Sequence, residues 1–113
     1  MRIGVPKEIK IHESRVGLTP TAVRELVAHG HQVMVQKNAG IQIDLDDGKY
    51  QSAGAEIVET PQEIYAKADL IVKVKEPQPN EIPLLRQGQV LFTYLHLAAD
   101  PVQTQGLIDS GCI

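Results

Sequence analysis

Two polar stretches follow strand-like apolar runs and carry residue types that could do chemistry. Lys75 comes directly after the apolar run 70–74, and His96 comes shortly after the run 90–93. In an open parallel sheet, ligands bind in the crevice beyond the carboxyl ends of the strands. An ammonium group and an imidazole delivered to that edge predict a small-molecule carboxylate site with an acid/base group.

Each of these residues has a plainer alternative. An ammonium group at a sheet edge can hold a carboxylate or polarise a carbonyl oxygen, but Lys75 could also be a surface lysine that ends a strand. The imidazole of His96 has an ordinary pKa of about 6.5, which suits proton transfer near neutral pH; a core histidine with satisfied hydrogen bonds is the alternative. Tyr94 could orient a ligand, although its position favours packing of the ring.

Arg15 lies in the long connection after the first apolar run. A guanidinium group there could hold a carboxylate through two parallel hydrogen bonds, which lysine cannot match; a surface salt bridge is the alternative. Because Arg15, Lys75 and His96 all follow strand ends, one cleft could hold all three. Lys73 lies inside an apolar run and alternates to the side opposite Val74, so we expect a structural or snorkelling lysine.

Other polar groups do not predict a site. His29 and His31 flank a glycine at an expected helix end, where a cation is favourable against the helix dipole. The run 44–48 superficially resembles a calcium loop but lacks the spacing of an EF-hand, so a solvated turn is expected. His12 has no third ligand near it in the sequence. We therefore expect no metal site, and the sequence contains no G-x-G-x-x-G, Walker A or C-x-x-C motif.

The elements that must position the candidate residues alternate between strand and helix. Cap-plus-proline pairs at residues 19–20, 60–61 and 100–101 indicate helix starts, and short apolar or alternating runs indicate strands. Such alternation predicts an α/β parallel sheet. Expected strands cover residues 2–5, 32–36, 56–58, 70–74 and 89–93. Expected helices cover residues 19–29, a short stretch around 49–53, about 60–67, at most a short piece of 80–86, and a last helix from 100 to 111, with a loop at 39–48.

The size and composition of the chain exclude several classes of protein. At 113 residues it is one domain, short for a complete two-substrate enzyme, and residues 112–113 look like the start of a further strand, so we expect a truncated domain. Eleven Lys and Arg against fourteen Asp and Glu, a formal charge of -3, give no electrostatic footprint for nucleic acid. No apolar run predicts a membrane span or a signal peptide. The single cysteine, Cys112, fits a reducing compartment, so we expect a cytoplasmic protein.

Several motif blocks are spread over nearly the whole chain, at residues 2–10, 13–16, 18–20, 53–57, 72–77 and 91–98. They resemble the N-terminal part of alanine dehydrogenase, in the alanine dehydrogenase and pyridine nucleotide transhydrogenase family. Transhydrogenase domains look alike near Arg15 but usually lack the Lys-Glu-Pro and Tyr-Leu-His blocks, so the resemblance favours alanine dehydrogenase. It implies a Rossmann-like or flavodoxin-like substrate-binding domain over residues 1–113.

The resemblance also implies roles for individual residues. Arg15 and Lys75, with Tyr94, would bind pyruvate or L-alanine, and His96 would be the catalytic acid/base that acts on the carbinolamine oxygen. Hydride would pass to or from NAD, ammonia would enter or leave, and the intact protein would be a homo-hexamer. The domain that binds NAD, with a second acidic catalytic residue, is absent from these 113 residues, so we expect no turnover by this chain alone.

Two departures from the family pattern leave alternatives open. The loop at residues 38–45 has fewer glycines than is common in the family, and the C-terminal segment that packs on this domain is absent. A transhydrogenase-type domain that binds no amino acid is the alternative within enzymes. A truncated, non-catalytic remnant or binding module is the alternative of a different class.

Overall fold

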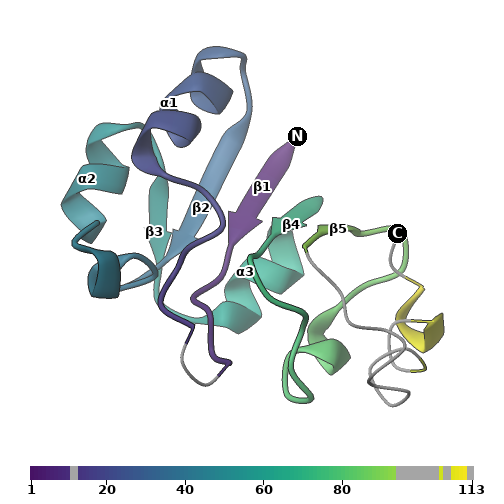
Figure 1. The fold of residues 1–113 in the computed structure, drawn as a ribbon. Coiled ribbons are helices and arrows are strands. Elements are labelled where there is room, and N and C mark those ends of the chain that lie inside the picture. Colours follow the sequence, from purple (N-terminus) through teal and green to yellow (C-terminus); the bar gives the residue numbers. More distant parts are fainter. Residues whose placement is uncertain (11–12, 94–104, 106–107, 112–113) are drawn as a thin grey trace.

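A five-stranded parallel sheet forms the centre of the computed structural model, which describes residues 1–10, 13–93, 105 and 108–111 (Figure 1). The strand order is β3-β2-β1-β4-β5, and each neighbouring pair is parallel. The α/β parallel fold predicted from the sequence is therefore confirmed. The strands are β1 (Arg2–Val5), β2 (Gln32–Gln36), β3 (Glu56–Val58), β4 (Leu70–Val72) and β5 (Val90–Phe92).

The strand order places a topological switch point between β1 and β4. From β1 the chain moves outward through β2 to β3, and it then returns to the other side of β1 to form β4 and β5. Connections that leave β1 and β4 therefore start side by side and diverge. The crevice outside the carboxyl ends of the strands at such a point is the usual ligand site of an open α/β sheet.

The α-helices that pack against the sheet each begin at a side-chain cap. They are α1 (Pro20–Ala28), α2 (Asp47–Ser52) and α3 (Pro61–Lys67). Thr19, Asp46 and Thr60 each accept a hydrogen bond from the backbone N–H three residues on, at 3.0 to 3.4 Å, which satisfies an otherwise unpaired helix-start donor. Gly30 follows α1 with a φ of +90°, as its predicted role at the helix end requires.

The helices divide between the two faces of the sheet, and each face has its own apolar core (Figure 1). On the first face, α1 and α2 cover a cluster centred on the fully buried Tyr50, whose hydroxyl donates to the Leu18 carbonyl at 2.7 Å. On the second face, α3 and the fully buried Tyr65 cover a cluster that includes Ile71 of β4. Both faces of the central strands are thus buried, as their apolar sequences predict.

The structure corrects the expected course of the chain between β2 and β3. Helix α2 begins at Asp47 and not near residue 49, because Asp46 caps it. The predicted solvated turn at 44–48 is therefore correct only up to Asp46, since residues 47 and 48 belong to the helix. A 3-10 helix, η1 (Ile41–Ile43), interrupts the expected loop. Farther along, the short helix expected within 80–86 is the 3-10 helix η2 (Ile82–Leu84).

Two strands are also shorter than expected, and the last elements fall mostly outside the described part of the chain. β4 ends at Val72 and not at Val74, and β5 covers residues 90–92 of the expected 89–93. Most of the predicted last helix, and all of the predicted strand start at 112–113, lie outside the described residues. Among those described, no helix has the length and apolar character needed to cross a membrane.

Candidate functional site

The connection from β1 to α1 carries Arg15 and lies directly against the end of β4. Gly17 makes this approach possible, because a Cβ atom at this position would lie 2.5 Å from the carbonyl oxygen of Val72. A backbone oxygen cannot rotate away as a flexible side chain can. The missing side chain therefore lets the Arg15 segment lie next to the strand that leads to Lys75.

Arg15 is held in a two-point ion pair with Glu13. Its Nε donates to Oε2 of Glu13 at 2.9 Å and its Nη2 donates to Oε1 at 3.0 Å, while its backbone N–H also donates to Oε2. The Glu13 side chain is 5% exposed, whereas that of Arg15 is 62% exposed. The salt bridge that the sequence left open as the alternative role of Arg15 is therefore present. The guanidinium nevertheless shows the fork-to-carboxylate geometry that recognises an anionic substrate.

Arg15 keeps the carboxylate of Glu13 ionised, with a smaller contribution from Lys75. The pKa of Glu13 is lowered from 4.5 to about 2, chiefly by the hydrogen bond from the Arg15 side chain, and the charge of Lys75 lowers it further. Desolvation works in the opposite direction and is outweighed. Arg15 and Lys75 thus both favour the ionised form of Glu13, and binding of one ligand by the two side chains stays a prediction.

This ion pair predicts how the stability of the protein depends on pH. Because the pKa of Glu13 is depressed in the folded state, its contribution is complete above the ordinary value of 4.5 and is lost as the pH falls towards 2. We expect the Glu13→Gln variant to lose less of its free energy of unfolding between pH 4.5 and 2 than the parent does. Urea unfolding at several pH values measures this; identical slopes for the two proteins would contradict it.

The loop after β4, which presents Lys75, is held by a carboxylate from the segment after β1. Oε2 of Glu8 accepts the backbone N–H of Val74 at 3.0 Å, and its Oε1 accepts the N–H of Lys75 at 3.2 Å. Lys10 forms a second link between the two segments through its ion pair with Glu76. These bonds explain why β4 ends early, since the amides that would continue its ladder donate to Glu8 instead.

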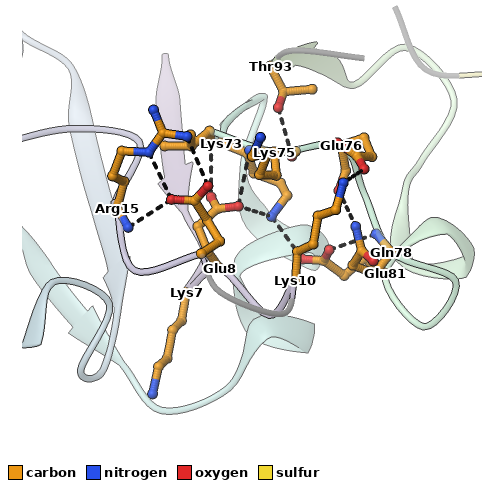
Figure 2. A network of polar contacts seen from close by, with 12 residues as sticks. Lys7, Glu8, Lys10, Arg15, Lys73, Lys75, Glu76, Gln78, Glu81 and Thr93 are labelled. Carbon is orange, nitrogen blue, oxygen red and sulfur yellow. Dashed lines mark hydrogen bonds and ion pairs between the residues drawn. The ribbon is translucent and has the colours of Figure 1, made fainter. Parts of the chain in front are cut away.

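Lys73 lies at the centre of a buried ion cluster, which corrects the snorkelling alternative for this residue. Its side chain is 1% exposed, and its Nζ lies 3.1 Å from Oε1 of Glu8 and 3.2 Å from Oε2 of Glu81. The two carboxylates are 2% and 4% exposed. A buried charge requires such partners, so the structural role expected for Lys73 is confirmed, but its charge stays inside the protein. Figure 2 shows Lys73 with Glu8 and Glu81 in this network.

Glu81 extends the cluster to the second core. Its carboxylate accepts the hydroxyl of Tyr65 at 3.1 Å and the backbone N–H of Gln78 at 2.9 Å. Burial, together with the negative charge of Glu81, raises the pKa of Tyr65, so the phenol stays protonated and serves as a donor. Two parts of the structure therefore hold the loop that carries Lys75. Helix α3 holds it through Tyr65 and Glu81, and the segment after β1 holds it through Glu8.

The open space beside Arg15 is small. A hollow of about 10 Å³ has room for roughly one water molecule. A wider groove of about 630 Å³ lies between the start of α1 and α2 and is lined by Arg24 and Lys49. It reaches the β1–α1 connection only at Thr19 and is not lined by Arg15. The smaller hollow is lined by Arg15 and by Glu8, which holds the loop of Lys75, so we favour it as the site. Its lining residues are Lys7, Glu8, Glu13, Ser14, Arg15, Ala39 and Gln42.

The structure thus places the segment that carries Arg15 beside the end of β4, the strand that leads to Lys75, and a common site for the two side chains stays a prediction. Tyr94 and His96 lie outside the described residues, so their predicted roles stay predictions. Sequence reasoning missed Glu13 as the partner of Arg15 and Glu8 as the residue that holds the loop of Lys75. The available signal was a carboxylate placed soon after β1, at the same sheet edge as Lys75.

The remaining histidines are partly accounted for. His29 caps α1, and its Nδ1 lies 2.8 Å from the Glu25 carbonyl oxygen, which confirms its predicted role. His31 contributes to the same helix end with its backbone N–H, which donates to Leu26. His12 and Cys112 lie outside the described residues. Within the ranges that the structure describes, no group of three or more His, Cys, Asp or Glu side chains could hold a metal ion.

Comparison with known proteins decides the family of the chain. The sequence pattern of the family described as "Alanine dehydrogenase/PNT, N-terminal domain" matches residues 4–113. The chain belongs to this family. Its sequence is 50% identical to that of an alanine dehydrogenase of Methanococcus maripaludis, over 96% of this chain and 29% of that protein. It is also 50% identical to an alanine dehydrogenase of Bacillus subtilis, over 98% of its length and 29% of that protein.

Solved structures give the same assignment. One L-alanine dehydrogenase superposes with a TM-score of 0.96 at 47% identity, over 99% of this chain and 31% of that chain. The transhydrogenase from Sinorhizobium meliloti superposes with a TM-score of 0.91 at 26% identity, over 99% and 33% of the two chains. The chain therefore corresponds to the N-terminal part of an alanine dehydrogenase and spans about a third or less of the length of these relatives.

Proposed function

We propose that this chain is the substrate-binding part of an NAD-dependent alanine dehydrogenase, which interconverts L-alanine with pyruvate and ammonia. The arrangement at the switch point carries the proposal, because the segment that holds Arg15 lies against the end of the strand that leads to Lys75. The paired geometry of Arg15 and Glu13 supports it further, because a 2-oxo acid offers the guanidinium group the same two oxygens.

Each residue has a part in the proposed reaction. Arg15 binds the substrate carboxylate and fixes its orientation, which places the reacting carbon. Lys75 donates to the carbonyl oxygen of pyruvate and stabilises the negative charge that develops there. His96 gives a proton to that oxygen or takes one from it as the carbinolamine forms or collapses, and Tyr94 contacts the substrate.

NAD itself does not fit the described residues. The turn after β1 lacks the glycine-rich fingerprint that admits a pyrophosphate. The backbone N–H groups of Val74 and Lys75 already donate hydrogen bonds to the carboxylate of Glu8. In our proposal NAD is bound outside these 113 residues. We also propose that the intact protein is a cytoplasmic homo-hexamer, as the resemblance implies.

The proposal predicts that the chain binds pyruvate without turning it over. NMR titration of the chain with pyruvate should shift amides of the segment 13–17 and the loop 73–77, whereas methyl pyruvate, which has no carboxylate, should not. Arg15→Ala combined with Lys75→Ala should weaken pyruvate binding by at least about tenfold, since hydrogen bonds to charged groups contribute about 1.5–3 kcal/mol each. Lys37→Ala, an exposed lysine that follows β2, is the control for charge alone.

Two outcomes would contradict this proposal. Pyruvate binding that survives the double substitution would mean that the site is misassigned. Formation of NADH from alanine and NAD by the purified chain would mean that the chain is not confined to substrate binding. A chain that binds no pyruvate at all would favour one of the two alternatives. These are the transhydrogenase-type domain, which the TM-score of 0.91 to such a protein supports, and a non-catalytic module.

A further inference from the structure

Two hydrogen bonds hold the main chain of Lys75 from opposite sides. Its backbone N–H donates to Oε1 of Glu8 at 3.2 Å, and its carbonyl oxygen accepts from Oγ1 of Thr93 at 2.8 Å. These two groups belong to the two peptide units on either side of the Lys75 Cα atom. Because each peptide unit is planar, fixing both units also fixes the direction in which the Lys75 side chain leaves the backbone.

The bond from Thr93 lies just beyond the regular pairing of β4 with β5. Among the described residues, this pairing reaches Val72 and Phe92, and a further main-chain bond runs from the Lys73 N–H to the Phe92 carbonyl at 3.0 Å. Beyond that point, the Thr93 hydroxyl connects the end of β5 to the loop that carries Lys75 (Figure 2). Thr93 is also the third residue before His96 in the sequence.

We propose that Thr93 and Glu8 are positioning residues that act through Lys75, and that their two bonds set the direction from which its ammonium group meets the substrate. We call this pair of bonds the Lys75 clamp. The inference rests on the proposed function, because it takes Lys75 as a substrate-binding residue. Glu8 also pairs with the buried Lys73, so a change at Glu8 would disturb folding, and Thr93 is the better residue to test.

Thr93→Val removes the hydroxyl group and keeps the shape of the side chain, whereas Thr93→Ser keeps the hydroxyl group. We expect Thr93→Val to weaken pyruvate binding by about threefold to tenfold, the usual range for loss of one hydrogen bond, and Thr93→Ser to stay within about twofold of the parent. Urea unfolding of each variant checks that the fold is retained. Parent-like affinity of Thr93→Val would overturn the inference.

A double-mutant cycle separates positioning from a general structural effect. If Thr93 acts through Lys75, then Thr93→Val should have no further effect on pyruvate affinity in the Lys75→Ala background. An equal loss of affinity in both backgrounds would overturn the inference while leaving the proposed function intact.

Amide hydrogen exchange tests the clamp without any ligand. In Thr93→Val, the amides of Val74 and Lys75 should exchange faster than in the parent, while the amides of α1 should not change. If the parent chain binds no pyruvate, the proposed function fails and this measurement still decides the clamp. Unchanged exchange at Lys75 would overturn it, and faster exchange confined to the loop would support it.

Discussion

Replacing Lys73 with methionine is expected to lower the free energy of unfolding by about 3–5 kcal/mol, the usual loss when one partner of a buried ion pair is removed. The change keeps the length and apolar stem of the side chain but leaves the carboxylates of Glu8 and Glu81 buried without their cation. Urea unfolding at neutral pH, followed by circular dichroism, measures the difference.

Lys67→Met is the matched control for this experiment. Lys67 pairs with Glu63 at 3.3 Å, but the two side chains are 53% and 37% exposed, and exposed helix pairs of this kind contribute only about 0.3–0.5 kcal/mol. The same chemical change should therefore have a small effect on the surface and a large effect in the cluster. Similar losses in both variants would mean that the cluster contributes no more than a surface pair.

The second large effect is expected from Gly17→Ala. The added Cβ atom would meet the Val72 carbonyl oxygen at 2.5 Å, so either the 13–17 segment or β4 must move. We expect a loss of about 1–3 kcal/mol in the free energy of unfolding, as for other overpacked sites. Pyruvate binding should also weaken, because Arg15 moves away from Lys75. NMR titration of the same variant measures the second effect.

Gly48→Ala is the control for the glycine substitution. Gly48 lies inside α2, and a Cβ atom there would meet Asp46 Oδ1 at 3.4 Å, an ordinary contact. Alanine is favoured over glycine in a helix by about 0.5–1 kcal/mol, so this variant should be as stable as the parent or more stable, with unchanged pyruvate binding. Parent-like stability and affinity of Gly17→Ala would contradict the proposed role of the close approach.

The elements that could be predicted are those whose signals are local. The caps at Thr19 and Thr60 depend on residues within one turn, and both helices begin where the sequence predicts. The end of β4 could not be predicted, because it depends on Glu8, which lies 66 residues from Val74 in the sequence. An apolar pattern shows which residues could continue a strand, but it does not show which acceptor their amides will find.

The same distinction applies to the site. The segments that carry Arg15 and Lys75 were predictable as neighbours, because parallel strands end at a common edge of the sheet. The roles of Glu8 and Glu13 were not, because a glutamate after a strand could equally face solvent, pair internally or bind a ligand. Glu8 pairs with Lys73, which is itself buried. That burial depends on tertiary packing, which no local sequence pattern specifies. The motif blocks indicated the family but not these pairings.

The strand order also constrains when the site can exist during folding. β1 meets β2 through contacts that are closer in sequence, whereas it meets β4 only across more than half of the chain, as in the bond between residues 2 and 69. Contacts between such distant residues form slowly. An intermediate that contains only the β1–β2–β3 half has no anion site, so pyruvate should slow unfolding of the native chain and leave early refolding events unaffected.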